Sequence, residues 1–445
     1  MQPSKLRQIA ITKTEPGDEN NQDISSLVGK VDIRKLELFS QNDPHAYSFS
    51  GGLNRSNQGL LEFVEMFKAP IKMLHPLLTA TQEGNYLGTE NIGVIPFQGI
   101  ILAHSNETEF KQFKNNKSNE AFLDRICVIK VPYCLRITEE EQIYSKLLRE
   151  SELATAPCAP NTLSTLAKFS VLTRLVPHAN SSLVAKMRVY DGEVVKDTDL
   201  KSKSMQEYRE AAGIDEGMSG ASTRFAFKVL SATFNYSSEE VSADPVHLMY
   251  VLELNIRREQ FPEAVEKTYL DFIKAELAPK FAEFIGKEIQ KAYIESYSEY
   301  GQNVFDRYVA HADAWMEDQD FKDADTGQMY NRSALDAELS KIEKPAGISN
   351  PKDFRSEVVK FCLRTRANTG KNPDWTSYEK MRDVIEKKMF SQIEELLPVI
   401  SFNAKKDQEI EKKHKSFMSR MMQSGYTERQ VRRLTEWFIR VSKAG

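Results

Sequence analysis

The hydrophobic pattern changes character near the middle of the chain, and this change limits the folds that the sequence can adopt. Before about His247, apolar runs of strand length end at turn residues, as in residues 99–105 and 125–133, and helical stretches separate them. From His247 onward, apolar residues recur every three or four positions over long stretches. The sequence therefore predicts the fold class α/β plus all-α, in that order along the chain.

The chain has 445 residues, which is longer than a single hydrophobic core usually organises, so we expect more than one domain. From the change in pattern and the Gly and Pro breaks, we expect an α/β core over residues 1–150, a helical segment over residues 151–240 and a helical region over residues 241–445. Helix starts are predicted at Asn350, which precedes a proline, and at Thr427, which has a glutamine three residues later.

The composition excludes several classes of protein. With 40% hydrophobic and 28% charged residues it is that of a soluble globular protein, and no apolar run approaches the roughly 20 residues that span a membrane. The first residues lack the apolar core of a secretory signal, so we expect a cytoplasmic protein. The four cysteines have neither C-x-x-C nor zinc-finger spacing, which indicates reduced thiols and no structural zinc. A net charge of -4 indicates no overall attraction to nucleic acid or acidic membranes.

Two charged segments have spacings that do not support a binding function. The aspartate-rich run over residues 318–330 lacks the positions of a calcium loop, so we expect a solvated turn and no metal site. The tail over residues 405–445 is basic, but its Met and aromatic residues predict ordinary amphipathic helices, and we do not expect it to bind nucleic acid.

One segment carries the first indication of nucleotide chemistry. Residues 57–86 contain a short apolar strand that ends in acids and a following helix, an arrangement that resembles the Walker B region of AAA+ ATPases. In those enzymes one carboxylate holds magnesium and a neighbouring glutamate orients the attacking water. Glu65 stands at the position of that glutamate, whereas the expected aspartate is Val64, and Glu62 lies two residues too early to replace it. The alternative is that Glu65 only caps the following helix.

Three more polar residues stand where AAA+ proteins have nucleotide-contacting groups. Asn106, after a predicted strand, resembles sensor 1, which contacts the γ-phosphate or its attacking water. Arg125 resembles an arginine finger, and Arg224, early in a helix after a glycine-containing turn, resembles the sensor 2 arginine of the lid. The plainer alternatives are a turn-forming asparagine and a salt bridge from Arg125 to Asp124 or Glu120. The order and spacing of these residues favour the nucleotide interpretation.

Longer strings, among them EFVEMFKAPIKMLHPLLTATQEGNY and EFIGKEIQKAYIESYSEYGQNVFDRY, resemble the PrkA family from about Gln8 to the C-terminus. The resemblance implies a bacterial, ATP-dependent serine protein kinase of the stress or starvation response, with an AAA+ core, a helical lid and a long helical C-terminal region. It also implies ATP and Mg²⁺ as cofactors, proteins phosphorylated on serine as substrates, and a homo-oligomer. The family's domain boundary is expected nearer residue 185.

The sequence departs from this family in one respect, because it contains no G-x-x-x-x-G-K-[ST] phosphate loop. In the family this loop lies upstream of the region that the chain resembles. We therefore expect a truncated AAA+ core, weak ATP binding by this chain alone, and an unpaired strand edge that promotes aggregation.

Motifs of ordinary protein kinases do not occur either, so no residue is assigned to phosphoryl transfer. Two alternatives to the kinase stay open. The first is an AAA+ ATPase that drives protein remodelling or proteolysis, and the second is a non-catalytic regulatory fragment.

Overall fold

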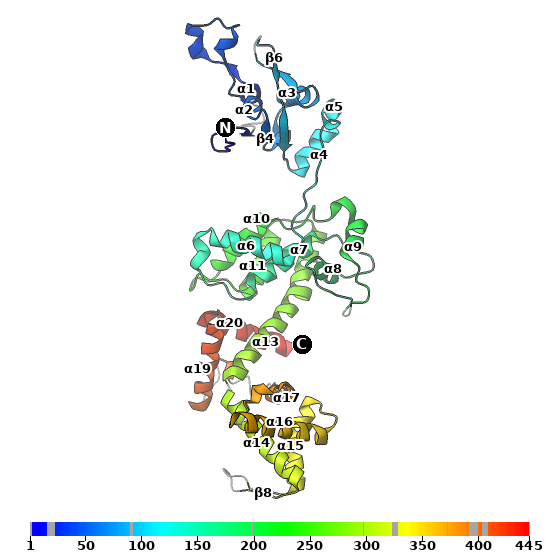
Figure 1. The fold of residues 1–445 in the computed structure, drawn as a ribbon, viewed down its shortest axis with the longest axis vertical. Coiled ribbons are helices and arrows are strands. Elements are labelled where there is room, and N and C mark those ends of the chain that lie inside the picture. The colour runs from blue at the N-terminus through cyan, green and yellow to red at the C-terminus, as the bar shows by residue number, and fades with distance from the viewer. Residues whose placement is uncertain are drawn as a thin grey trace. The chain divides into compact units, whose positions relative to one another are not determined.

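The computed structural model divides into two compact units, Met1–Lys130 and Val131–Gly445. The first contains the parallel sheet and the second is built mainly from helices, so the predicted order of an α/β part before a helical part is confirmed (Figure 1). The change was predicted near His247, however, whereas the chain is already helical from Ile137 onward. The residues that the structure describes are 2–15, 23–89, 92–196, 199–296, 298–322, 328–371, 373–390, 399–402 and 408–444.

The first unit is organised around a parallel sheet of three strands in the order β1-β4-β7. Their side chains alternate between two faces, as the pleat of a strand requires. Leu61 and Phe63 of β4 are fully buried, whereas Ile100 and Leu102 of β7 are more than half exposed on the other face. The bounds of the three strands are β1 (Ile11–Thr14), β4 (Gly59–Phe63) and β7 (Gly99–Ala103).

Helices cover the buried face of this sheet. Leu74 and Leu77 of α3 share one hydrophobic cluster with the inward residues of β4, and Phe113 of α4 and Phe122 of α5 extend it. The helices of this unit are α1 (Ser25–Val28), α2 (Gly52–Arg55), α3 (Ile71–Gln82), α4 (Glu107–Asn115) and α5 (Glu120–Leu123). Two antiparallel pairs complete it, β2 (Lys30–Val31) with β3 (Tyr47–Ser48) and β5 (Asn85–Leu87) with β6 (Val94–Pro96).

One predicted strand is wrong. Residues 126–136 have no regular secondary structure, although their apolar run predicted a strand over residues 125–133. A strand forms only where a neighbouring strand accepts and donates its backbone hydrogen bonds. In the described part of the chain, β7 pairs with β4 alone, so no partner is present for this segment. Val128 and Ile129 are consequently exposed.

The second unit is helical and has its own hydrophobic core, which reaches from Ile137 to Trp437. Helix α13 packs against both α19 and α20, and α14 packs against α15 and α16. Its helices are α6 (Ile137–Arg149), α7 (Thr162–Arg174), α8 (Leu183–Tyr190), α9 (Met205–Ala212), α10 (Thr223–Phe234), α11 (Pro245–Arg258), α12 (Glu263–Asp271), α13 (Ala278–Ser296), α14 (Ser298–Glu317), α15 (Arg332–Ala346), α16 (Pro351–Thr369), α17 (Glu379–Phe390), α19 (Gln408–Gln423) and α20 (Glu428–Ala444). One short antiparallel pair, β8 (Phe321–Lys322) with β9 (Met329–Tyr330), lies between α14 and α15.

Both predicted helix starts in this unit are confirmed. The Asn350 side chain accepts a hydrogen bond from the third residue of α16, which begins at Pro351. Two hydrogen bonds join Thr427 and Gln430 at the start of α20. The Thr427 N–H donates to Gln430 Oε1, and the Gln430 N–H donates to Thr427 Oγ1. The aspartate-rich run falls partly on residues 323–327, which lie outside the described residues. Across the helices that are described, we find none with the length and apolarity to span a membrane.

Candidate functional site at the ends of β4 and β7

Glu65 occupies the tip of the sheet, between the backbones of two neighbouring strands. The N–H of Val64 still donates to the carbonyl of Thr14 on the β1 side, whereas the N–H of Met66 donates to the carbonyl of His104 on the β7 side. Glu65 links these two directions in a left-handed conformation, with φ 48° and ψ 47°. A non-glycine residue held in this region costs about 1–3 kcal/mol, and such strain is concentrated at functional positions.

Asn106 follows the neighbouring strand β7 and begins helix α4. Its Oδ1 accepts a hydrogen bond from the Glu109 N–H at 2.8 Å, and its Nδ2 donates to Glu109 Oε1 at 2.8 Å. Asn106 is therefore an N-cap in this structure, whereas the plainer interpretation of the sequence predicted a turn-forming asparagine. Because the carboxyl ends of parallel strands meet at one edge of a sheet, it still lies at the same edge as Glu65.

A lysine and a glutamate connect these two predicted residues. Lys68 Nζ lies 2.6 Å from Glu65 Oε2 and 3.6 Å from Glu109 Oε1. Glu109 completes the chain of contacts through its hydrogen bonds to Asn106. The hydrogen bond to Glu65, more than any other effect, raises the pKa of Lys68 above its usual value, so the side chain stays charged.

Neither connecting residue was predicted from the sequence, although local spacing indicates both. Lys68 stands three residues after Glu65, and Glu109 stands three residues after Asn106. Asn at a helix start with Glu three residues later is a capping pattern, and opposite charges three residues apart can pair. Nothing local indicates that the two pairs meet, because they belong to different strand ends.

Arg125 lies apart from these contacts. Its Nε donates to Gln82 Oε1 at 2.7 Å, at the end of α3, and its Nη1 donates to the carbonyl of Ala121. Among the described side chains Arg125 forms no ion pair with Asp124 or Glu120, so the predicted salt-bridge alternative is not formed, and its partners are neutral. Its side chain is exposed. The structure therefore gives Arg125 a weakly held, accessible guanidinium within its own unit.

Arg224 belongs to the second unit, whereas the other three predicted residues belong to the first. It is the second residue of α10, after the N-cap Ser222, and its side chain is exposed. The turn before it needs glycine, because Gly220 has φ +103° and a Cβ there would lie 2.5 Å from the Thr173 carbonyl oxygen. This turn fixes the direction in which α10 begins.

A buried ion pair holds the same turn in place. Arg174, at the end of α7, pairs with Glu140 of α6 at 2.7 Å, and both side chains are completely buried. The same guanidinium donates to the carbonyl of Ala221, just before α10, and to the carbonyl of Cys134. One arginine thus ties α6, α7 and the start of α10 together, and through them it positions the backbone of the predicted sensor arginine.

The described residues do not fit a magnesium site on their own. Glu62, the other acid near the strand end, lies on the face of β4 opposite the buried Leu61 and Phe63 and pairs with Lys5 at 2.9 Å. The hydrogen bond from Lys5 is the main effect that lowers the pKa of Glu62. Glu65 and Glu109 share the ammonium group of Lys68 instead of a metal ion. No group of three or more potential metal ligands occurs in the described part of the chain.

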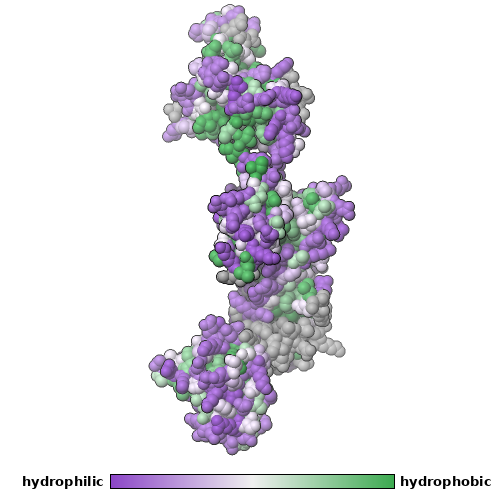
Figure 2. Space-filling view, turned by 90° about the vertical axis from the view of Figure 1, so that its right-hand side faces the viewer, coloured by the Kyte–Doolittle hydropathy of each residue, from purple (hydrophilic) through white to green (hydrophobic). Residues whose placement is uncertain are grey.

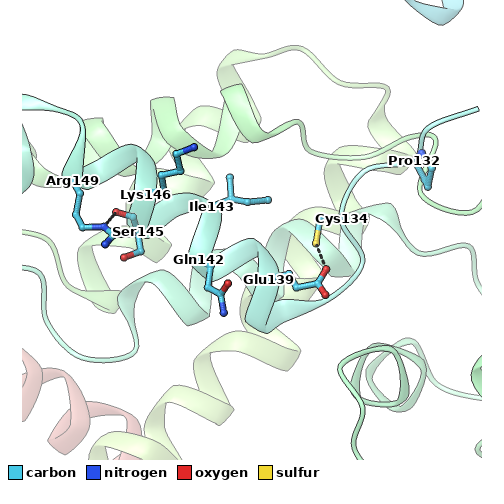
Figure 3. A pocket seen from close by; sticks show the side chains of 8 residues that line it. All are labelled: Pro132, Cys134, Glu139, Gln142, Ile143, Ser145, Lys146 and Arg149. Atoms are coloured by element: carbon cyan, nitrogen blue, oxygen red, sulfur yellow. Dashed lines mark hydrogen bonds between the residues drawn. The ribbon is translucent and has the colours of Figure 1, made fainter.

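A hollow of about 760 Å³ lies along the outer side of α6 in the second unit (Figure 3). Cys134 lines this hollow, and its thiol points toward Glu139. Burial is the main effect that raises the pKa of the Cys134 thiol, so the thiol is a poor nucleophile. None of the four predicted site residues lines the hollow. The lining consists of Pro132, Cys134, Glu139, Gln142, Ile143, Ser145, Lys146 and Arg149.

Comparison with protein families gives matches over nearly the whole chain. The family described as PrkA AAA domain matches residues 1–182, and the family described as PrkA serine protein kinase C-terminal domain matches residues 184–437. The protein therefore consists of an AAA-type domain with a small parallel sheet, followed by a helical C-terminal region. It belongs to the PrkA family.

Two relatives show how far this similarity extends. The serine/threonine kinase YeaG of Escherichia coli (strain K12) is 68% identical over 443 residues, which cover 99% of this chain and 69% of the relative. The ATP-dependent protease PrkA of Bacillus subtilis (strain 168) is 34% identical over 441 residues, which cover 98% of this chain and 68% of that protein. A crystal structure of NtrX from Brucella abortus aligns with a TM-score of 0.26 at 12% identity over 59% of this chain and 57% of its own, and carries no argument about the fold.

Proposed function

We propose that this chain acts as an ATP-dependent serine/threonine protein kinase. The observation that carries the proposal is the 68% identity to a protein named a serine/threonine kinase, over 99% of the chain. The family resemblance adds the expected setting, which is phosphorylation of protein serines in the cytoplasm, in a homo-oligomer, under stress or starvation.

Within this proposal, Glu65 and Asn106 act on the nucleotide. Both lie at the carboxyl ends of adjacent parallel strands, where doubly wound sheets bind their ligands. Glu65 would orient the attacking water, and Asn106 would turn its amide from Glu109 toward the terminal phosphate. ATP supplies the transferable phosphoryl group.

The two arginines have proposed roles of their own toward the nucleotide. Arg125 would reach the nucleotide of a neighbouring copy, because its guanidinium is exposed and held only by neutral acceptors. Arg224 would serve from a lid formed by residues 151–240, in which Arg174 fixes the turn before α10. Both roles need a permanent positive charge that can bind phosphate oxygens.

The second candidate function is ATP-driven proteolysis, and one relative favours it. The Bacillus subtilis relative, 34% identical over 98% of this chain, is named an ATP-dependent protease. The proposed roles of Glu65, Asn106 and the arginines concern nucleotide hydrolysis, which serves a protease or remodelling motor as well as a kinase. The site alone therefore does not choose between these reactions.

One experiment distinguishes the candidates. The protein is purified from its own cells, as wild type and as Glu65→Gln, and incubated with γ-labelled ATP and dephosphorylated casein. We expect labelled phosphoserine in casein, and release of free phosphate that falls about 100-fold or more in Glu65→Gln. Casein cleavage without phosphoserine would refute the kinase and support the protease. A Glu62→Gln variant serves as the matched control, because Glu62 is an acid of β4 three residues before Glu65 that pairs with Lys5.

ATP binding by the 445-residue chain is tested separately. Since the sequence holds no glycine-rich phosphate loop, we expect calorimetric titration with ATP and Mg²⁺ to give no micromolar affinity. Micromolar binding would show that other groups of this chain hold the phosphates.

A further inference from the structure

Lys68 holds a position between the two strand ends that carry Glu65 and Asn106. It closes the short 3-10 segment Met66–Lys68 that leaves β4. Its ammonium group is 2.6 Å from one carboxylate and 3.6 Å from another, and the two acids belong to different elements, the turn after β4 and helix α4. An ordinary surface ion pair links one lysine to one acid and contributes little.

The backbones on either side of this contact are held together by aromatic packing. Phe67 is next to Lys68, and the centroid of its ring lies 4.4 Å from the ring centroid of Phe113 and 5.5 Å from that of Phe110, both on α4. Phe113 is buried in the core of the first unit. The separation between Lys68 and Glu109 is therefore set by the core, and it does not depend on two long side chains meeting by themselves.

Glu109 links Lys68 to Asn106. Its Oε2 accepts from Ser105 Oγ at 3.0 Å, its Oε1 accepts from Asn106 Nδ2, and its own N–H is capped by Asn106 Oδ1. The Glu109 side chain is only 16% exposed. A displacement of its carboxylate would therefore change the hydrogen bonding of the Asn106 amide directly.

We propose that Lys68 is a positioning residue, whose ammonium group fixes the Glu65 carboxylate and couples it, through Glu109, to the amide of Asn106. The inference rests on the proposed role of Glu65 and Asn106 in nucleotide hydrolysis. Lysine suits this role because its compact charge carries three donors and no acceptor, so it can serve two carboxylates at once. A lysine is charged at physiological pH, and the hydrogen bond to Glu65 raises its pKa further.

The direct test is the side-chain amide of Asn106. In ¹⁵N-labelled chain, the Asn106 Nδ2 resonance is compared between wild type, Lys68→Met, Lys68→Arg and Lys72→Met. We expect it to move in Lys68→Met, to return most of the way in Lys68→Arg, and to stay in place in Lys72→Met, which removes an exposed lysine of α3. An unchanged resonance in a folded Lys68→Met protein would overturn the proposal.

Kinetics supply the second readout, on the protein purified from its own cells. We expect Lys68→Met to lower kcat for ATP hydrolysis about 10-fold with KM for ATP within about 2-fold, because the carboxylate is misplaced and not lost. If Glu65→Gln leaves hydrolysis unchanged, the proposed function fails while the amide resonance still reports the coupling. If Glu65→Gln abolishes hydrolysis and Lys68→Met changes neither kcat nor the resonance, the positioning role alone fails. Should Lys68→Met not fold, Lys68→Gln replaces it under the same criteria.

Discussion

At the scale of single residues, the second unit contains a cluster of buried charges around Arg355. Arg355 is 1% exposed and forms a forked pair with Glu343, Nε to Oε1 and Nη2 to Oε2, each at 2.7 Å. Its third donor group, Nη1, binds Asp336 at 2.6 Å. Tyr308 donates its hydroxyl to the same Glu343 carboxylate. This cluster joins α14, α15 and α16.

Replacing Arg355 by methionine should destabilise the protein strongly. The variant leaves the buried Glu343 carboxylate without its cation, and a broken buried pair costs about 3–5 kcal/mol. Urea unfolding followed by circular dichroism measures the loss. Lys341→Met is the matched control, since it breaks a mostly exposed pair with Glu338 and should cost less than about 1 kcal/mol. Equal midpoints for the two variants would contradict the prediction.

His247 should make the stability of the second unit depend on pH. Burial lowers its pKa below the usual 6.5, Asp244 at 3.6 Å opposes this, Arg433 adds to it, and the ring of Tyr236 packs against the imidazole. Because the folded state binds a proton less readily than the unfolded state, stability is present above pH 6.5 and declines as the pH falls below it. Thermal unfolding between pH 7.5 and 5.5 measures the decline. The slope should be smaller in His247→Gln, and an identical slope would refute the assignment to this residue.

At the scale of elements, β7 is one of the two edge strands of the parallel sheet in the described part of the chain. Figure 2 shows hydrophobic side chains exposed together on the first unit. Ile100 and Leu102 on the open face of β7, and Val128 and Ile129 in the segment beyond α5, are each more than half exposed. An unpaired edge beside exposed apolar side chains promotes association between molecules.

A charge on the open face of β7 should therefore reduce self-association. We expect Leu102→Lys to lower light scattering of the concentrated chain severalfold while its thermal midpoint changes little, since the side chain is 57% exposed. Ile101→Lys is the matched control on the same strand, and it should lower the midpoint because Ile101 packs against the core. Unchanged scattering in Leu102→Lys would mean that association uses another surface.

At the scale of the whole molecule, the two units have separate hydrophobic cores. The first core runs from Leu27 to Phe122, and the second from Ile137 to Trp437. Cooperative unfolding follows the extent of a shared core, so each unit is expected to unfold as its own cooperative element.

Calorimetry of the intact chain should show two unfolding transitions. Leu74→Ala, in the first core, should lower one midpoint, and Leu252→Ala, in the second, should lower the other, because deleting a fully buried leucine costs about 2–5 kcal/mol. A single transition that both substitutions move would contradict this prediction.

The sequence predicted much of the local structure. The strand predicted over residues 99–105 forms as Gly99–Ala103, and the helix starts at Asn350 and Thr427 are confirmed. An α/β part precedes a helical part as predicted, although the helices begin near Ile137 and not near His247. These features depend on side-chain alternation, capping side chains and helical periodicity, which are set within a few residues of sequence.

Parts of the candidate site could not be predicted in the same way. The sequence placed Glu65 and Asn106 at strand ends, which the structure bears out, but their roles in catalysis stay predictions. The left-handed backbone of Glu65 follows from hydrogen bonds to two different strands, and no glycine or asparagine indicated it. The link through Lys68 and Glu109 needs the two strand ends to be neighbours, which only the paired sheet establishes.

By itself, the sequence determined the family, the order of an α/β part before a helical part, and the helix caps, since these depend on long matching strings and on interactions between nearby residues. The tertiary structure decided that residues 126–136 form no strand, because a strand needs a partner that its own sequence does not contain. It also decided that Arg433 of α20 binds the buried Asp244 at the start of α11, 189 residues earlier. Contacts of this kind depend on where the packed helices bring charges together, and no spacing along the chain encodes them.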